Sequence, residues 1–298
     1  MMRTVMWLCG LTAVCGFAAG LDEVVEPGTK ARKLAGGFLF TEGATVDAKG
    51  EVFFTDQPND RIYRWTEKDG LRVFMEPSGR ANGMCFAPDG TLLVCADLRT
   101  ELWEVQPNGD RKVIANRFED KAFNGPNDVW ACPQGGGCYF TDPFYKRSWW
   151  QYDSPPQGSR QVYYLPKGKR PVRVTTDLVQ PNGIVGTPDG KTLYVADIDA
   201  KKVYVYAIQP DGTLADRRVF CEEPSDGMTI DADGRIYLAN QNVSVYSPKG
   251  EKLGVIGIPE GWCGNLCIGG PGKDTLFVTA SKGFYAVPLK VKGSKQGK

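Results

Sequence analysis

Polar side chains with oxygen donors recur six times along this chain, each beside a Gly or Asp and each at the head of an apolar run. Carboxylate and amide oxygens bind hard cations, and a carboxylate can also act as a general base. Histidine is absent, which excludes Ser-His-Asp and Cys-His catalysis as well as His-ligated zinc. Any chemistry must therefore use carboxylates, amides, hydroxyls, Lys, Tyr or a hard metal. The six residues are Glu42, Asn82, Asn127, Asn182, Asp226 and Asn265.

The spacing of these residues indicates the elements that position them. Successive members are 40, 45, 55, 44 and 39 residues apart, and most of the apolar runs end in an Asp-Gly turn. A period of this size, with turns and short strands but no helical pattern, is typical of a β-propeller. Radial symmetry would gather the six side chains at one end of a central channel.

The segment after the fourth polar residue shows the repeating unit most clearly. Strands are expected at 184–185, 192–196, 202–206 and 218–220, with an Asp-Gly turn after the first. The last unit lacks an outer strand after 284–287, whereas the segment 31–35 precedes the first unit and has no partner. We therefore predict an all-β, six-bladed propeller whose last blade is closed by the N-terminal strand 31–35.

Four of the six polar residues form a set that could bind a metal. Glu42, Asn127, Asn182 and Asp226 supply two carboxylates and two amides, which suit Ca²⁺ because it takes several oxygen ligands in irregular geometry. Soft metals would favour Cys or His ligands. The alternative is that Asn, Asp and Gly recur only because the turns between blades need them.

A long aromatic segment, 142–152, follows the second strand of the third unit. The chain direction places it on the same face as the polar cluster, so we expect it to overhang the channel mouth. Tyr145 and Trp149 are candidate substrate-binding residues there, because exposed aromatic side chains suit sugar stacking or a lid. The alternative is an ordinary surface loop.

Short motifs carry a family resemblance over nearly all of residues 34–287. They are FTEGATVD (40–47), RANGMCFAPDG (80–90), NGPNDVW (124–130), YFTDPFYKRSWW (139–150), QPNGI (180–184) and SDGM (225–228). Together they resemble the SMP-30/gluconolactonase/luciferin-regenerating-enzyme family, in its bacterial gluconolactonase form. The resemblance implies a hydrolase of sugar lactones with one divalent metal, usually Ca²⁺ (Zn²⁺, Mg²⁺ and Mn²⁺ are alternatives), bound by Glu42, Asn127, Asn182 and Asp226. Gly125 departs from the animal-type members, which carry an arginine there.

Lactone hydrolysis assigns a role to each candidate. Asp226 is the expected general base that activates water, and Glu42 is the alternative. The metal would polarise the lactone carbonyl. Asn82 and Asn265 could donate hydrogen bonds to sugar hydroxyls, and Asp128 could orient Asn127 or contact the substrate.

Two other functions are compatible with the same fold. A non-catalytic propeller of the NHL type would bind partners and would not need the four metal-binding candidates. A metal-dependent esterase or phosphotriesterase would keep the metal and change the substrate.

The N-terminal segment predicts export. Residues 1–20 combine Arg3, an apolar run and a small-residue cleavage site, as in a secretory signal peptide. We expect the mature chain, 21–298, to form one propeller domain in the periplasm or outside the cell, without a membrane anchor. Of the 36 basic residues 35 then remain against 35 acidic ones, and no basic cluster suggests nucleic acid.

Seven of the nine cysteines follow the predicted signal segment. In an oxidising compartment some could form disulfides. Cys132 and Cys138 flank a Gly-rich hairpin turn and are the best candidates for a pair, while Cys85 and Cys95 lie on adjacent predicted strands. The absence of histidine argues against any of them being an activated nucleophile.

Overall fold

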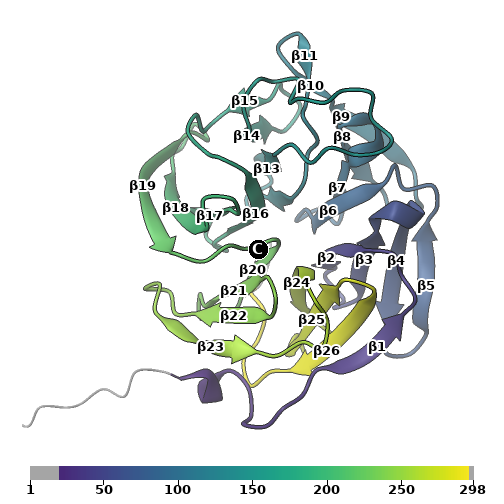
Figure 1. Cartoon of the computed structure of the whole chain (residues 1–298), viewed down its shortest axis with the longest axis vertical. Helices are drawn as coiled ribbons and strands as arrows, with labels where there is room; N and C mark the ends of the chain where they lie inside the picture. The colour runs from purple at the N-terminus through teal and green to yellow at the C-terminus, as the bar shows by residue number, and fades with distance from the viewer. Residues whose placement is uncertain (1–19, 295–298) are drawn as a thin grey trace, which may run out of the picture.

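A computed structural model describes residues 20–294, which form six four-stranded antiparallel sheets around a central channel (Figure 1). The prediction of a six-bladed propeller is confirmed. Blade 1 contains β2 (Thr41–Val46), β3 (Val52–Asp56), β4 (Arg61–Thr66) and β5 (Gly70–Met75). Blade 2 contains β6 (Ala81–Phe86), β7 (Leu92–Ala96), β8 (Glu101–Val105) and β9 (Arg111–Ala115). Blade 3 contains β12 (Val129–Ala131), β13 (Gly137–Asp142), β14 (Gln161–Pro166) and β15 (Val172–Arg173).

The other three blades follow the same order, with the first strand of each lining the channel. Blade 4 contains β16 (Pro181–Gly186), β17 (Thr192–Asp197), β18 (Lys202–Ile208) and β19 (Leu214–Cys221). Blade 5 contains β20 (Met228–Ile230), β21 (Ile236–Ala239), β22 (Val243–Tyr246) and β23 (Lys252–Ile256). Blade 6 contains β24 (Cys263–Gly269), β25 (Thr275–Ala280) and β26 (Gly283–Pro288). Smaller elements are η1 (Leu21–Glu23), η2 (Gln57–Asn59), η3 (Asp97–Arg99), β10 (Arg117–Phe118) and β11 (Lys121–Ala122).

The N-terminal strand closes the ring. β1 (Arg32–Gly36) pairs antiparallel with β26 and forms the outer edge of blade 6, as predicted from the missing strand. The observed strand lies one residue C-terminal to the expected segment 31–35. Because β1 comes from the start of the chain and β24, β25 and β26 from its end, blade 6 ties the two together (Figure 1).

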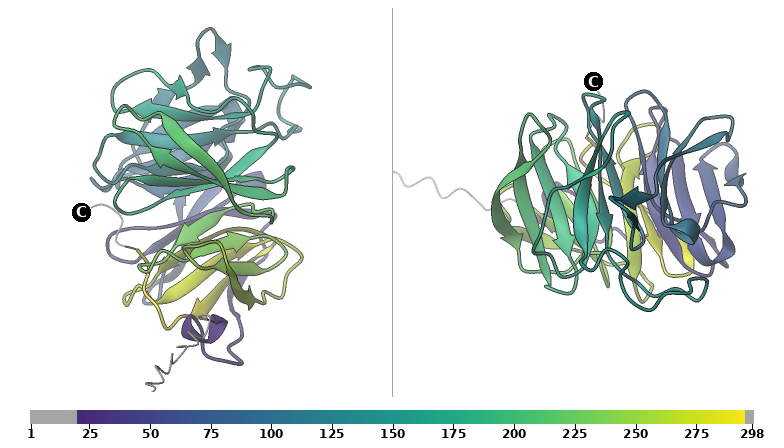
Figure 2. Two further views of the ribbon diagram at one scale, coloured as in Figure 1. Left: turned by 90° about the vertical axis from the view of Figure 1, so that its left-hand side faces the viewer. Right: turned by 90° about the horizontal axis from the view of Figure 1, so that it is seen from above.

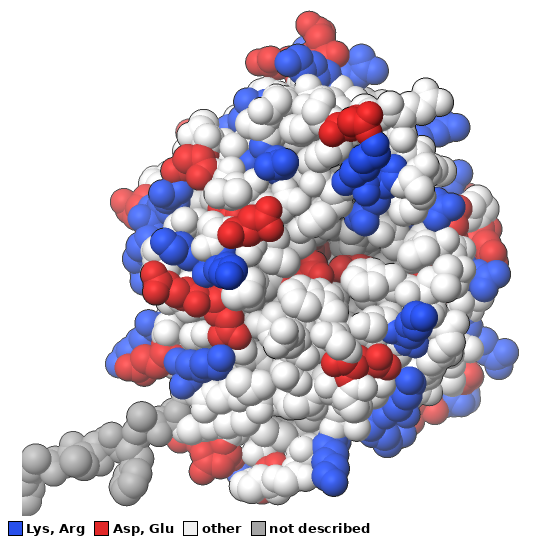
Figure 3. All heavy atoms as spheres, in the orientation of Figure 1, with Lys and Arg blue, Asp and Glu red and all other residues white. Residues whose placement is uncertain are grey.

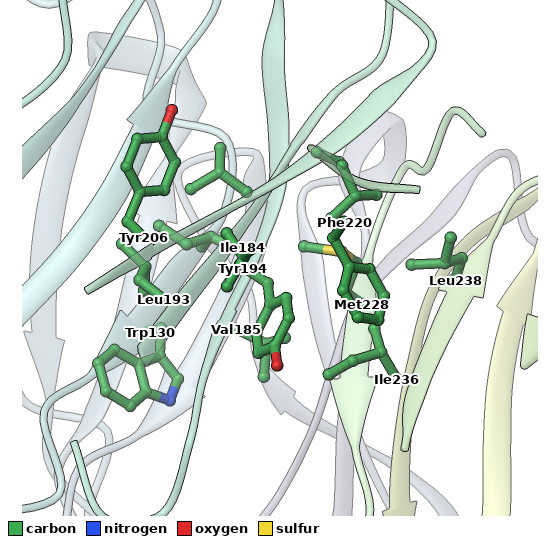
Figure 4. Close-up of a cluster of buried hydrophobic side chains, with 14 of the residues drawn as sticks. Trp130, Ile184, Val185, Leu193, Tyr194, Tyr206, Phe220, Met228, Ile236 and Leu238 are labelled. Carbon is green, nitrogen blue, oxygen red and sulfur yellow. The ribbon is translucent and has the colours of Figure 1, made fainter. Parts of the chain in front are cut away.

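Apolar side chains fill the spaces between neighbouring blades. Figure 4 shows one such layer, where Trp130 of blade 3 and Leu193 and Tyr194 of blade 4 are buried in the same cluster as Met228 and Ile236 of blade 5. The side chains of a strand alternate between its two faces, so each sheet contributes one set of residues to each neighbouring blade. This packing holds the inner strands, and hence the channel residues, in place.

The predicted Cys132–Cys138 disulfide is wrong. The seven cysteines within residues 20–294 all have free thiols. Cys138 lies opposite Ala131, and its side chain is buried between blades 2 and 3. Cys132 is the next residue after Ala131, so it points to the other face of the sheet and packs against the core between blades 3 and 4. The two sulfur atoms therefore lie on opposite sides of one sheet.

The predicted signal segment, 1–20, lies outside the described residues except for Gly20, and export stays a prediction. Within residues 20–294 no helix has the length and hydrophobicity needed to cross a membrane.

Candidate active site

All six polar residues of the repeat lie at the start of an inner strand or just before it. Glu42, Asn82, Asn182 and Asn265 each stand at a break in strand register, where β2, β6, β16 and β24 pair irregularly with the second strand of their blade. Irregularities of this kind redirect a side chain away from the regular alternation of the strand. Asn127 and Asp226 come just before β12 and β20. All six are buried.

Glycines beside these residues allow the inner strands to approach closely. A Cβ on Gly183 would lie 2.2 Å from the carbonyl oxygen of Asp226 in the next blade. A Cβ on Gly43, where φ is +56°, would lie 2.0 Å from the carbonyl oxygen of Asn82. A Cβ on Gly83 would lie 2.4 Å from the carbonyl oxygen of Asn127, and a Cβ on Gly227 would lie 2.4 Å from the side chain of Asn265. The recurring glycine therefore reflects close contact between blades, and the polar residue beside it faces the channel.

Glu42 and Asp226 form a buried pair of carboxyl groups. Burial raises the pKa of Glu42 well above its usual value, and the charge of Asp226 raises it further. Burial also raises the pKa of Asp226, to about 6, although Trp262 and Asn182 donate hydrogen bonds that lower it. The indole Nε1 of Trp262 donates to Asp226 Oδ2 at 2.6 Å. Trp262 thus fixes the orientation of the Asp226 carboxyl group.

The two amides of the predicted set enter the channel from blades 3 and 4. Asn182 donates its Nδ2 to the hydroxyl of Tyr145 at 2.8 Å, which orients the amide. The main chain of Asn127 is held on both sides: its N–H donates to Thr141 O at 2.9 Å and its carbonyl accepts from Gly83 at 2.7 Å. Its side chain is buried. The side-chain oxygen of Asn182 accepts no hydrogen bond within residues 20–294, so it is available as a ligand.

The donor set fits a hard divalent cation. Among the residues 20–294, no basic side chain forms an ion pair with Glu42 or Asp226, and Arg147 pairs instead with Asp97 at 3.2 Å. Two buried carboxylates without a cation are unfavourable, since each disfavours the charge of the other. In the described part of the chain no three His, Cys, Asp or Glu side chains cluster for a metal, so a cation here would need the amide oxygens too. Oxygen-only ligands suit Ca²⁺.

Asp128 and Asn265 are held by hydrogen bonds within the protein. Burial raises the pKa of Asp128 to about 7, while hydrogen bonds from Val129, Ile184 and Asn265 lower it. Asn265 Oδ1 accepts the N–H of Leu266 at 2.8 Å. Both side chains line a cavity of about 570 Å³ whose lining does not include Glu42 or Asp226. Their polar atoms are engaged with the protein, which leaves them less free for a substrate than expected.

Asn82 lies on blade 2, between Glu42 of blade 1 and Asn127 of blade 3. Its carbonyl accepts a hydrogen bond from the hydroxyl of Thr55 at 3.2 Å, and its side chain is buried. No side-chain hydrogen bond of Asn82 occurs within residues 20–294, so its amide remains available in the channel.

The segment between β13 and β14 carries Tyr145 and Trp149 to the mouth of the channel, and it projects from one face of the ring in Figure 2. Asp97 anchors this segment: it accepts Arg147 Nε at 3.2 Å through Oδ2, and Trp150 Nε1 at 2.9 Å through its carbonyl. Figure 3 shows the face of the molecule seen in Figure 1, with acidic atoms inside its central hollow.

Gly125 makes room for this anchoring. A Cβ at this position would lie 2.5 Å from the indole of Trp150 and 3.2 Å from Asp97 Oδ1. A larger residue at position 125 would displace Trp150. The glycine that departs from the animal-type pattern is thus explained by the packing of the aromatic segment.

Two residues at the site were not predicted. Trp262 contacts Asp226 from the connection between β23 and β24, and the guanidinium of Arg147 lies close enough to lower the pKa of both Glu42 and Asp226. Neither residue belongs to the repeating motif. An arginine inside the aromatic segment was the one available signal for Arg147.

Comparison with known proteins identifies the family of this chain. The sequence profile of the SMP-30/Gluconolactonase/LRE-like region matches residues 40–282. A gluconolactonase from Zymomonas mobilis is 30% identical over 93% of this chain and 86% of its own length. A pentonolactonase from Haloferax volcanii is 29% identical over 78% of each chain. The solved structure of a gluconolactonase from Xanthomonas campestris has a TM-score of 0.81 at 27% identity, covering 90% of this chain and 92% of its own. The chain therefore belongs to the SMP-30/gluconolactonase/LRE-like family.

Proposed function

We propose that this protein is an enzyme that hydrolyses sugar lactones with the help of one divalent cation, most simply Ca²⁺. The observation that carries the proposal is the buried carboxyl pair of Glu42 and Asp226, which has no basic partner within residues 20–294 and lies in one channel with the amide of Asn182. Two relatives described above, a gluconolactonase and a pentonolactonase, support the substrate class.

The metal would be held by Glu42, Asn127, Asn182 and Asp226. A divalent cation bound there would polarise the lactone carbonyl and stabilise the negative charge that develops on its oxygen. Asp226 is the group best placed to take a proton from the attacking water, because the hydrogen bond from Trp262 to its Oδ2 fixes the orientation of the carboxylate.

The substrate would enter from the face that carries the aromatic segment. Tyr145 is fixed by Asn182 and lies beside the proposed metal ligands. Trp149 lies under Arg80, whose guanidinium carbon is 4.3 Å from the ring centroid. These rings form one wall of the mouth, where the ring of a sugar lactone could pack.

The other two candidate functions are less well supported. An NHL-type binding module would gain nothing from two buried carboxyl groups that disfavour each other's charge. A phosphotriesterase or esterase would share the metal site, and only a substrate panel separates it from a lactonase.

The test is a panel of lactones, aryl esters and phosphotriesters, assayed with a chelator and again after Ca²⁺ is restored. We expect hydrolysis of D-glucono-1,5-lactone that the chelator abolishes and Ca²⁺ restores. Lactone hydrolysis that continues at the same rate in the chelator would reject the metal-dependent mechanism. Turnover of the phosphotriester alone would reject the lactonase.

A further inference from the structure

We propose that Arg147 is the specificity residue of this site, and that it selects lactones whose ring carries hydroxyl groups over unsubstituted lactones. The inference rests on the proposed lactonase function. It assigns to a residue outside the repeating motif the recognition of the part of the substrate that does not react.

The position of Arg147 is the first argument. Its guanidinium carbon lies 5.6 Å from the ring centroid of Tyr145 and 5.7 Å from that of Trp149. Tyr145 in turn accepts a hydrogen bond from Asn182, one of the proposed metal ligands. A chain of direct contacts therefore connects the guanidinium to the metal site, and it lies at the side of the mouth where the substrate would enter.

The free donors of Arg147 are the second argument. A guanidinium has five N–H groups in a fixed planar arrangement. Among the described residues, Asp97 Oδ2 is the one acceptor that Arg147 finds, and it binds Nε at 3.2 Å. The N–H groups on the two Nη atoms thus have no protein acceptor within residues 20–294. When substrate closes the site and excludes water, leaving these N–H groups unpaired is unfavourable. Oxygen atoms of the substrate can accept the hydrogen bonds instead.

The charges around Arg147 indicate what kind of substrate group would accept its hydrogen bonds. Asp97 is 2% exposed at its side chain and neutralises Arg147, which is 22% exposed. A neutralised arginine offers directed hydrogen bonds without much net positive charge, which suits the hydroxyls of a neutral polyol better than a phosphate. The anchor also holds the guanidinium still, so that little side-chain entropy is lost when a substrate binds.

The contacts of Asp97 explain why the arginine is so well placed. The same residue accepts the indole N–H of Trp150 through its main-chain carbonyl, and Gly125 leaves the space that Trp150 occupies. Contacts with residues of blades 2 and 3 thus fix the position of the Arg147 side chain.

The experiment compares two lactones of equal ring size. D-Glucono-1,5-lactone carries hydroxyls, whereas δ-valerolactone carries none. Values of kcat/KM are measured with Ca²⁺ present for the wild type, Arg147→Met and Arg147→Lys. If δ-valerolactone is not turned over, its competitive inhibition constant replaces kcat/KM. Arg111→Met is the matched control, because Arg111 also stacks on an indole, that of Trp103 at 4.4 Å, and lies outside the site.

We expect Arg147→Met to lower kcat/KM for D-glucono-1,5-lactone by about 10- to 100-fold, since one or two hydrogen bonds to a charged donor are lost. The value for δ-valerolactone should fall by a clearly smaller factor, because the hydroxyl contact is absent from that substrate and only the effect of the Arg147 charge on Glu42 and Asp226 is lost. Arg147→Lys should fall between, since it keeps the charge next to Asp97 but loses the planar array of donors. Arg111→Met should match the wild type with both lactones.

Two results would overturn the proposal. Equal losses with both lactones would mean that Arg147 supports the site in general, and no loss with either would mean that it does not contact the substrate. Melting temperatures of all variants show whether a loss comes from unfolding, and Arg147→Lys carries the test if Arg147→Met does not fold. A wild type that hydrolyses neither lactone would instead refute the proposed function, and the specificity role with it.

Discussion

Trp262 shows how a residue outside the repeat can control one that lies within it. Its indole N–H donates to Asp226 Oδ2 at 2.6 Å, and its own main chain is held by Ser281, whose hydroxyl donates to Trp262 O at 3.0 Å and accepts its N–H at 3.2 Å. The carboxylate of Asp226 cannot rotate freely while this bond exists. Both oxygens of the Asp226 carboxylate are therefore held in one orientation.

Replacing Trp262 by Phe removes the donor and keeps a ring of related shape. We expect kcat for D-glucono-1,5-lactone to fall by about 10-fold, the scale expected when a hydrogen bond to a charged group is lost. KM should change little, because the substrate contacts are not altered. Steady-state kinetics at saturating Ca²⁺ tests this. An unchanged kcat would show that Trp262 does not position Asp226.

At the residue scale the sequence reveals the members of the repeat but not their neighbours. Glu42, Asn127, Asn182 and Asp226 recur with the blades, so their meeting in one channel follows from symmetry. Trp262 and Arg147 reach the same place from irregular connections. The course of such connections depends on packing between blades, which no local pattern records.

The inner strands are the elements that make the site, and glycine is what lets them pack. Gly183 is the clearest case, because its position is pressed against the main chain of Asp226 in the next blade. A methyl group there cannot be accommodated by rotation of a side chain. The two strands would have to separate, and both Asn182 and Asp226 would move.

Gly183→Ala should therefore reduce both stability and activity. We expect the free energy of unfolding to fall by about 2–3 kcal/mol, in the upper range for overpacking. Gly257→Ala is the matched control, since a Cβ at Gly257 meets nothing within 4 Å. Urea unfolding of both variants measures the difference. Equal stabilities would mean that the inner strands separate without cost.

A second element-scale prediction concerns Glu223, which follows β19 and joins blade 4 to blade 5. Burial alone would raise the pKa of Glu223. Hydrogen bonds from Ser244, Tyr246, Lys252 and Asn240 lower it by more than burial raises it, so the pKa is lowered overall. A carboxylate whose pKa is lowered by folding stabilises the protein at pH values above its pKa in the unfolded chain. This stabilisation is lost as the pH falls through its pKa in the folded protein.

Glu223→Gln should accordingly destabilise the protein by about 1 kcal/mol at pH 7. The difference from the wild type should shrink below pH ~4, where the carboxylate is protonated in the unfolded chain and begins to be in the folded one. Thermal unfolding measured across pH tests the sign. A difference that grows toward acidic pH would contradict it.

The order of the strands could be predicted from the sequence, but the direction of some side chains could not. The closing strand was expected at 31–35 and is found at Arg32–Gly36, because an unpaired strand and an incomplete blade must satisfy each other. The prediction of a Cys132–Cys138 disulfide is wrong because the spacing around a hairpin turn does not reveal which face of the sheet each side chain occupies. The register of β12 and β13 determines it.

For the molecule as a whole, the question is what keeps the ring closed. β1 is the outer strand of blade 6 and pairs with β26 over four residue pairs, so it holds the first and last parts of the chain together. Without it, β26 would present an open edge, and the apolar core beneath it would lose the packing of Leu34 and Ala35.

A chain that begins at Gly37 should be less stable than one that begins at Arg32. Both lack the segment before β1, so the comparison isolates the closing strand. We expect a drop in melting temperature of more than about 5 °C, together with aggregation through the exposed edge. Differential scanning calorimetry and light scattering provide the measurements. Equal melting temperatures would mean that closure by β1 is dispensable.

The central claim is that one channel site, made by four blades, binds a single divalent cation that hydrolysis needs. Calorimetric titration of Ca²⁺ into the chelator-treated protein tests it most directly, with Asp226→Ala as the site variant and Asn265→Ala as the control that keeps all four proposed ligands. The account predicts one ion per chain for the wild type and Asn265→Ala, and loss of that binding in Asp226→Ala with its circular dichroism spectrum preserved. Binding of one Ca²⁺ to Asp226→Ala with the affinity of the wild type would contradict it.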